Sequence, residues 1–278
     1  GKLHVVCTTG MIGDLVKNIG GDRLDVTSLM GPGVDPHVYK ASHGDVEQLS
    51  AADIVFYNGL LLEGKMVDIF KKMGRQKPVI PVARDIPEDS LIQPPEYEGN
   101  YDPHVWFDIE LWQQTIPVVV SELSSLDSAG TDTYRSNAEE YNSRLDSLDR
   151  WVKQEISRIP EQQRVLVTAH DAFGYFGKAY DIEVVGLQGI STVAEFGVKD
   201  VRNLADLIVE RQVKAIFVES SIPERPINAV KQACQSRGFS VRIGGTLYSD
   251  AMGPVGSGAD TYLTMVQHNV NTIVSALN

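Results

Sequence analysis

The sequence predicts an α/β protein of two lobes, each a parallel four-stranded βα sandwich, joined by one long rigid backbone helix. Two observations predict this fold. First, β-branched apolar runs alternate with helical patterns in both halves of the 278 residues, and such alternation produces parallel strands through right-handed crossovers. Second, the longest helical pattern lies between the halves. We therefore expect an N-terminal lobe over 1–130, the backbone helix over 131–160, and a C-terminal lobe over 161–278.

Four strands are expected in the first half, namely Leu3–Thr9, Leu24–Met30, Ile54–Tyr57 and Val79–Val82. Apolar residues from Met11 to Ile19 recur at helical spacing, and Gly20-Gly21 ends that helix. We expect further helices at about 45–51, over roughly 60–73, and through Trp112.

Four strands are also expected in the second half, namely Val165–Thr168, Glu183–Val185, Ala215–Val218 and Ser240–Ile243. Helices are expected between and after them, near 172–179, 199–211, 226–236 and 261–277. The two halves share the order of their elements but show no sequence repeat.

The helix between the halves has the clearest amphipathic pattern in the chain. Its apolar residues step by threes and fours from Tyr134 to Ile159 and so form one stripe. Thr131 is the expected N-cap, and Pro160 ends the helix. At ~1.5 Å per residue the helix would run roughly 40 Å, which predicts a rigid connection.

Composition and charge exclude several classes of function. The chain is 42% hydrophobic and 22% charged, and its net charge is −12, which argues against nucleic acid or an anionic membrane surface as a partner. No apolar run reaches the length of a transmembrane helix. The first residues already have the pattern of a strand, so we expect no signal peptide within this sequence. Cys7 and Cys234 lie in different halves and are expected to be buried thiols.

Four polar residues follow predicted strands, at the edge where open α/β sheets bind ligands. The tripeptide Asp-Pro-His occurs twice, ending at His37 and His104, while His170 and Asp250 follow strands of the second half. Three imidazoles and one carboxylate suit a borderline metal such as zinc. With two ligands from each half, the metal is expected between the lobes. An aspartate of the tripeptide could also accept a ring N–H from a metal-bound histidine.

Simpler explanations exist for each residue taken alone. A single Asp-Pro-His is usually a turn, His170 could be a hydrogen-bonded histidine at a strand end, and Asp250 could be a cap. The joint placement of the four favours a metal site. Glu219 could support a ligand or simply begin a helix, and we leave its role open. The remaining histidines, namely His4, His43 and His268, are interpreted as structural or surface residues.

No catalytic motif is present. The chain lacks His-Glu-x-x-His, Gly-x-Ser-x-Gly and a Walker A loop. A catalytic zinc usually keeps three protein ligands and an open position, whereas four protein ligands indicate capture and release. We therefore predict a binding protein and not an enzyme.

The segments around the four residues resemble the zinc/manganese solute-binding proteins of ABC importers, TroA type. They are Gly31–His37, Asp102–Trp106, Thr168–Phe176 and Tyr248–Gly253. By motif match the resemblance implies the ligands His37, His104, His170 and Asp250. It also implies a metal buried between two α/β lobes, delivery to a membrane permease, and export, often with a lipid anchor through a cysteine upstream of this sequence.

Two departures from other branches of that family make the chain resemble the mixed TroA-like branch, which is not dedicated to one metal. Members regarded as manganese-selective have glutamate where His170 stands, and zinc-dedicated members carry a histidine-rich loop, whereas 84–101 has no histidine. The function expected is thus a monomeric, extracytoplasmic receptor for Zn²⁺ or Mn²⁺ that serves an ABC-importer permease. The alternatives are a zinc-dependent hydrolase and a cell-adhesion protein with a structural metal.

Overall fold

The computed structural model describes residues 1–278, which form two compact units, 1–149 and 150–278. The first unit is built on one parallel sheet in the order β2-β1-β3-β4. Its strands are β1 (Leu3–Thr9), β2 (Leu24–Met30), β3 (Ile54–Tyr57) and β4 (Val79–Pro81). The predicted four-stranded parallel sheet of the first half is confirmed.

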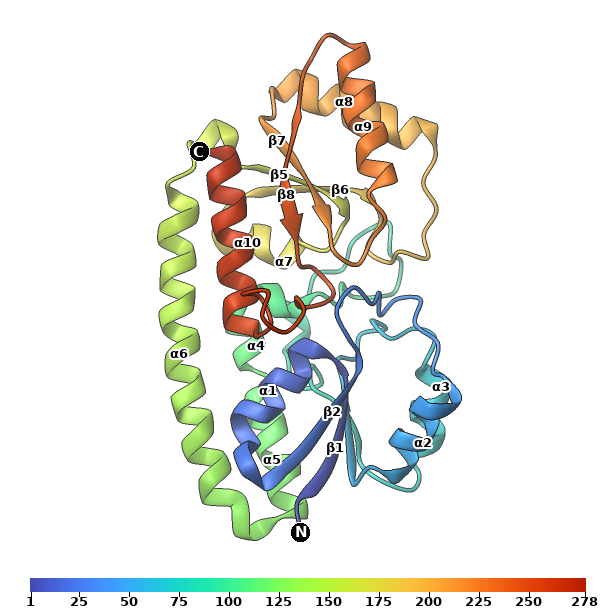
Figure 1. Ribbon diagram of the computed structural model, residues 1–278, viewed down its shortest axis with the longest axis vertical. Coiled ribbons are helices and arrows are strands. Elements are labelled where there is room, and N and C mark those ends of the chain that lie inside the picture. Colours follow the sequence, from blue (N-terminus) through green and yellow to red (C-terminus); the bar gives the residue numbers. More distant parts are fainter. The chain divides into compact units, whose positions relative to one another are not determined.

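Helices cover both faces of this sheet (Figure 1). The helices of this unit before the long helix are α1 (Gly10–Gly20), α2 (His43–Ala51), α3 (Val67–Met73), α4 (Ile109–Gln113) and α5 (Ile116–Leu126). Leu49 of α2 and Phe70 of α3 pack with Val6 and Val55 of the sheet. On the other side α1 contacts β1, β2 and α5. The sequence analysis did not anticipate α5.

The helix expected over 60–73 begins only at Val67. The preceding residues Gly59, Leu60 and Leu61 have φ values of +88°, +56° and +63°, in the left-handed region that a right-handed helix cannot include. The chain therefore makes a turn from 60 to 66 before α3 begins.

The long helix α6 spans Thr131–Ser157. The division of the chain into the two units falls within this helix, after Asp149. The predicted stripe is buried in full, from Tyr134 to Ile159. The predicted N-cap is wrong, because a 3₁₀ turn over Ser128–Gly130 runs directly into the helix and Thr131 has helical angles. Other 3₁₀ turns lie at Gly21–Arg23, Glu88–Ser90, Val105–Phe107 and Glu161–Gln163.

The second unit contains two hydrogen-bonded parallel strand pairs, β5-β6 and β7-β8, where one continuous sheet was expected. The strands are β5 (Val165–His170), β6 (Glu183–Gln188), β7 (Ala215–Glu219) and β8 (Arg242–Leu247). β5 and β7 still lie side by side. At their carboxyl ends the backbone N–H of His170 donates to the Glu219 side chain (2.8 Å), so that group is not available to a strand ladder.

β8 begins two residues later than predicted. It also ends four residues later, because Gly244 and Gly245 interrupt the apolar pattern from which the strand was predicted. A Cβ on Gly244 would lie 2.8 Å from Ala276 Cβ and from Phe217 Cε1. Glycine at this position therefore allows the C-terminal helix to pack closely against the strand.

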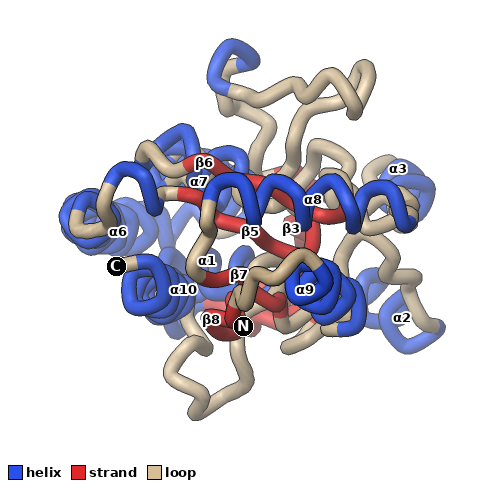
Figure 2. Tube along the Cα trace, turned by 90° about the horizontal axis from the view of Figure 1, so that it is seen from above, coloured by secondary structure: helices blue, strands red, loops and turns tan.

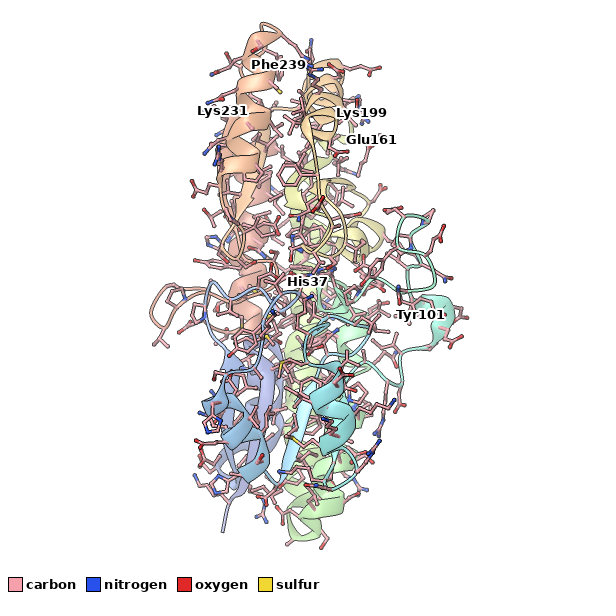
Figure 3. The ribbon with its side chains drawn as sticks, turned by 90° about the vertical axis from the view of Figure 1, so that its right-hand side faces the viewer. His37, Tyr101, Glu161, Lys199, Lys231 and Phe239 are labelled. Carbon is pink, nitrogen blue, oxygen red and sulfur yellow. The ribbon has the colours of Figure 1, made fainter.

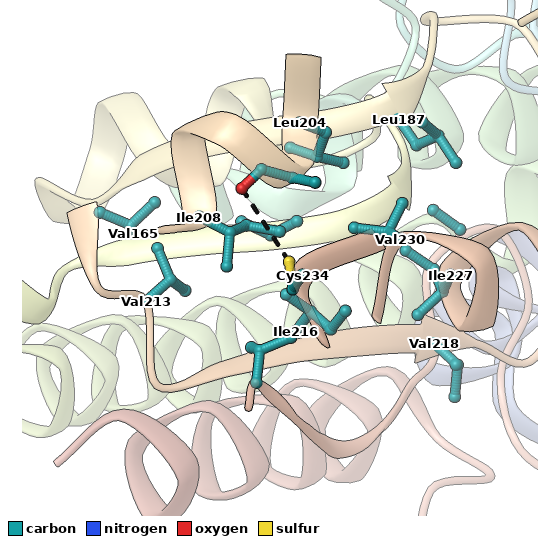
Figure 4. Close-up of a cluster of buried hydrophobic side chains, with 14 residues drawn as sticks. Val165, Leu187, Leu204, Ile208, Val213, Ile216, Val218, Ile227, Val230 and Cys234 are labelled. Atoms are coloured by element: carbon teal, nitrogen blue, oxygen red, sulfur yellow. Dashed lines mark hydrogen bonds between the residues drawn. The ribbon is translucent and has the colours of Figure 1, made fainter. Parts of the chain in front are cut away.

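The helices of the second unit are α7 (Gly174–Tyr180), α8 (Val198–Arg211), α9 (Arg225–Ser236) and α10 (Tyr262–Leu277). Figure 2 shows α8 and α9 side by side. A buried cluster joins them to β5 and β7 (Figure 4), and Cys234 packs in it with Sγ 4.0 Å from the Ala205 carbonyl oxygen. Cys7 and Cys234 are both buried, free thiols, as expected. None of the helices is long and apolar enough to cross a membrane.

Candidate metal centre

The first unit brings His37 and His104 together at the carboxyl ends of its strands. His37 lies in the loop after β2 (Figure 3), and His104 directly precedes the 3₁₀ turn at Val105–Phe107. Both side chains are buried, and their Nε2 atoms are 3.2 Å apart. Two nitrogens bound to one tetrahedral zinc at ~2.1 Å would be about 3.4 Å apart. The spacing of the pair therefore fits two ligands of one ion.

The repeated tripeptide forms the same turn in both places. Asp35 Oδ1 accepts the backbone N–H of His37, and Asp102 Oδ1 accepts that of His104, both at 2.9 Å. The intervening proline has a fixed φ and no N–H of its own, so the aspartate reaches past it to the histidine. The sequence thus dictates the backbone of both histidines locally.

Asp102 also orients the His104 ring. Its Oδ1 lies 2.7 Å from His104 Nδ1, and because a carboxylate only accepts, Nδ1 carries the proton. That tautomer places a lone pair on Nε2, the nitrogen directed at His37. The contact is the one expected of an aspartate that supports a metal-bound histidine.

The second unit brings His170 and Asp250 together. His170 ends β5, Asp250 follows β8, and both are buried. His170 Nε2 lies 3.0 Å from Asp250 Oδ2, while Nδ1 lies 2.7 Å from Glu219 Oε1. Glu219, whose role the sequence left open, therefore supports His170 from the end of β7 and accepts its backbone N–H as well.

The pKa of His170 is raised well above 6.5. Burial of the ring opposes its charge and would lower the pKa, but the attraction of Glu219, then Asp250, and hydrogen bonds to both outweigh it. In the absence of metal the two carboxylates therefore favour the protonated form of the imidazole.

Asn269 of α10 supports the segment that carries Asp250. Its side chain accepts the Tyr248 N–H (2.9 Å) and donates to the Tyr248 carbonyl (2.8 Å). The residue is buried among apolar side chains of the helix. A polar residue on the apolar face of the last helix was the only sequence signal for it, and the sequence analysis missed it.

The remaining histidines lie elsewhere. His43 begins α2 with its side chain 91% exposed, 3.3 Å from Glu47. His4 pairs with Asp25 at the surface, and His268 Nε2 lies 3.0 Å from the Thr246 carbonyl. None of the three contacts the two pairs described above.

Comparison with known proteins gives a consistent set of matches. The family model described as zinc-uptake complex component A, periplasmic (ZnuA), matches residues 5–276. The manganese-binding lipoprotein MntA of Bacillus subtilis is 52% identical over 99% of this chain and 90% of its own length. The manganese ABC transporter substrate-binding lipoprotein PsaA of Streptococcus mitis is 31% identical, over 99% of this chain and 89% of its own.

The zinc-binding protein TroA of Treponema pallidum matches in both sequence and structure. It is 47% identical over 100% of this chain and 89% of its own sequence. The solved structure of periplasmic TroA superposes with a TM-score of 0.97 and covers 100% of this chain and 99% of that one. The chain is therefore similar to relatives named for zinc and to relatives named for manganese.

Proposed function

The chain belongs to the zinc-uptake complex component A family, and we propose that it is a solute-binding protein that captures a divalent transition metal and delivers it to an ABC-importer permease. The observation that carries the proposal is the pairing of buried metal-binding side chains in each unit, with carboxylates behind two of the histidines. Names of relatives as ABC transporter substrate-binding proteins support the permease as partner.

The ligands in this proposal are His37 and His104 of the first unit and His170 and Asp250 of the second, all on one ion. Each unit alone supplies two donors, which is half of a tetrahedral zinc shell. The two pairs would together supply the four donors of such a shell. Such a site needs only one chain, which supports a monomer.

Three nitrogens and one oxygen favour Zn²⁺ over Mn²⁺ in affinity. A relative named for manganese is 52% identical to this chain, which supports Mn²⁺ as the second cargo. Four protein ligands would leave no position for a catalytic water, which supports capture over hydrolysis. The relatives named as lipoproteins support a location at the outer face of the membrane, with a lipid anchor on a preceding cysteine.

The test begins with metal analysis of protein purified without added metal, followed by titration of metal-free protein with Zn²⁺ and competition with Mn²⁺. We expect one ion per chain, tighter binding of Zn²⁺, and a metal-free protein that remains folded. Unfolding on metal removal would favour a structural metal, and turnover of an ester with an open coordination position would favour a hydrolase. Either result would overturn the proposal.

A further inference from the structure

Asn58, at the carboxyl end of β3, contacts the tripeptide that carries His104. Its side-chain amide donates to the Pro103 carbonyl oxygen (3.0 Å) and to the Gly59 carbonyl oxygen (3.0 Å). The side chain is buried, with 1% of its surface exposed. This buried amide donates a hydrogen bond to a loop 45 residues further along the chain. The bond fixes the loop that contains Pro103 relative to the sheet.

The carbonyl of Pro103 and the N–H of His104 belong to one peptide group. Asn58 holds this group by its oxygen, and Asp102 Oδ1 holds it by its nitrogen at 2.9 Å. Because the peptide is planar, fixing both ends sets its orientation, and this determines the direction in which the His104 side chain leaves the backbone. Asp102 then sets the rotation of the ring through Nδ1.

Glu63 in turn holds Asn58. Its Oε2 accepts the Asn58 backbone N–H (2.6 Å) and the Thr8 hydroxyl (2.7 Å), and its Oε1 accepts the Gly59 N–H (3.3 Å). Glu63 is also buried. The carboxylate therefore ties the ends of β1 and β3 to the turn that follows β3.

That turn is strained. Leu60 and Leu61 are non-glycine residues in the left-handed region, a conformation that is unfavourable for residues with a side chain and persists only where the surroundings impose it. The Glu63 carboxylate accepts the backbone N–H groups of Asn58 and Gly59, which precede Leu60 and Leu61. It thus helps to hold the turn, together with the hydrogen bond from the Leu62 N–H to the Gly59 carbonyl oxygen (3.1 Å).

We propose that Asn58 is a positioning residue for metal binding, which sets the Pro103–His104 peptide, and that Glu63 holds Asn58 in place. This inference rests on the proposed function, since it assumes that His104 binds the metal. Outer partners of metal ligands are typically worth 10- to 100-fold in affinity, and we expect an effect within that range for Asn58.

The test compares Asn58→Leu, which keeps the approximate size but removes the donor, with Asn137→Leu as the matched control. Asn137 Nδ2 also donates to a backbone carbonyl, that of Ile19, at 2.9 Å in the same unit. Both variants should lose stability, but only Asn58→Leu should weaken Zn²⁺ binding, by about tenfold or more. Equal affinity in the two variants would overturn the proposal.

A double-mutant cycle separates positioning from a general loss of stability. Asn58→Leu should weaken Zn²⁺ binding in the native background and have no further effect when His104 is already alanine. A full effect of Asn58→Leu in the His104→Ala background would refute the positioning role. If His104→Ala itself left Zn²⁺ affinity unchanged, the proposed function would fail instead, so the two failures are distinguishable.

Discussion

His104 in the first unit and His170 in the second have similar supports but different surroundings. Each has a carboxylate 2.7 Å from Nδ1, from Asp102 and from Glu219 respectively. Beyond Nε2, however, His104 faces the imidazole of His37, whereas His170 faces the carboxylate of Asp250. The first unit thus pairs two nitrogen donors, and the second encloses one ring between two acids.

This difference assigns different tasks to the two pairs. In the proposed site, the two adjacent imidazoles of the first pair would contribute nitrogen donors, which favour zinc. In the proposed site, the two carboxylates favour the protonated form of the His170 ring, so protons would compete with the metal at the second pair and binding would depend on pH. The predictions below test this division of roles.

The largest effect is expected from removing a ligand. His170→Ala and His104→Ala should each weaken Zn²⁺ binding by more than about 100-fold, since loss of an outer partner alone costs 10- to 100-fold. Calorimetric titration or chelator competition measures this. His43→Ala is the control, because His43 is exposed on α2 and should leave affinity unchanged. Equal affinity in His170→Ala and His43→Ala would remove His170 from the ligand set.

Replacing the nitrogen donor of His170 with a carboxylate oxygen should have the second-largest effect on metal binding. His170→Glu would place three carboxylates together, with Glu219 and Asp250, and the metal-free protein should lose stability through their repulsion. The harder donor should also narrow the preference for Zn²⁺ over Mn²⁺. Thermal unfolding without metal and competition between the two ions measure both effects. A variant whose metal preference and metal-free stability match the native protein would contradict the ligand role of His170.

The pH dependence should reflect the raised pKa of His170. Its proton contributes stability to the metal-free protein that is fully present below the unfolded pKa of ~6.5 and is lost as pH rises through the folded pKa. Zn²⁺ affinity should correspondingly rise with pH until the pH reaches the folded pKa of His170, by about tenfold per pH unit for this one proton.

Glu219→Gln tests the cause of that pH dependence. Without the Glu219 charge the pKa of His170 should fall, so the rise in affinity with pH should shift to lower pH. Titrations from pH 6 to 9, with Asp102→Asn as the matched variant in the first unit, measure the shift. If both variants move the profile equally, the two histidines do not differ in the way proposed.

The smallest effect is expected at Asn269. Asn269→Leu removes both hydrogen bonds to Tyr248 and should lower the free energy of unfolding by about 1–3 kcal/mol. The loop that carries Asp250 should loosen, with a loss of Zn²⁺ affinity of only a few-fold. Unfolding in urea and metal titration check the two parts, and a loss as large as that of His170→Ala would contradict a purely supporting role.

Strands, helices and turns that depend on neighbouring residues could be predicted from the sequence. Hydrophobic periodicity placed most strands to within a few residues, because side chains alternate along a strand and repeat by 3.6 along a helix. The Asp-Pro-His turns also depend only on adjacent residues, since proline removes a donor and aspartate reaches the next one. His37, His104, His170 and Asp250 could be proposed as a set because each follows a predicted strand.

Contacts between residues far apart in the sequence could be seen only in the tertiary structure. Glu219 supports His170 because β7 lies beside β5, and Asn58 reaches Pro103 across 45 residues. Leu60 and Leu61 adopt left-handed backbone angles in a turn that Glu63 helps to hold. The apolar spacing of this segment predicted a helix and did not reveal the turn. The raised pKa of His170 likewise arises from two acids contributed by other strand ends. Hydrogen bonds and charge interactions act through space, and the order of residues along the chain does not contain that proximity.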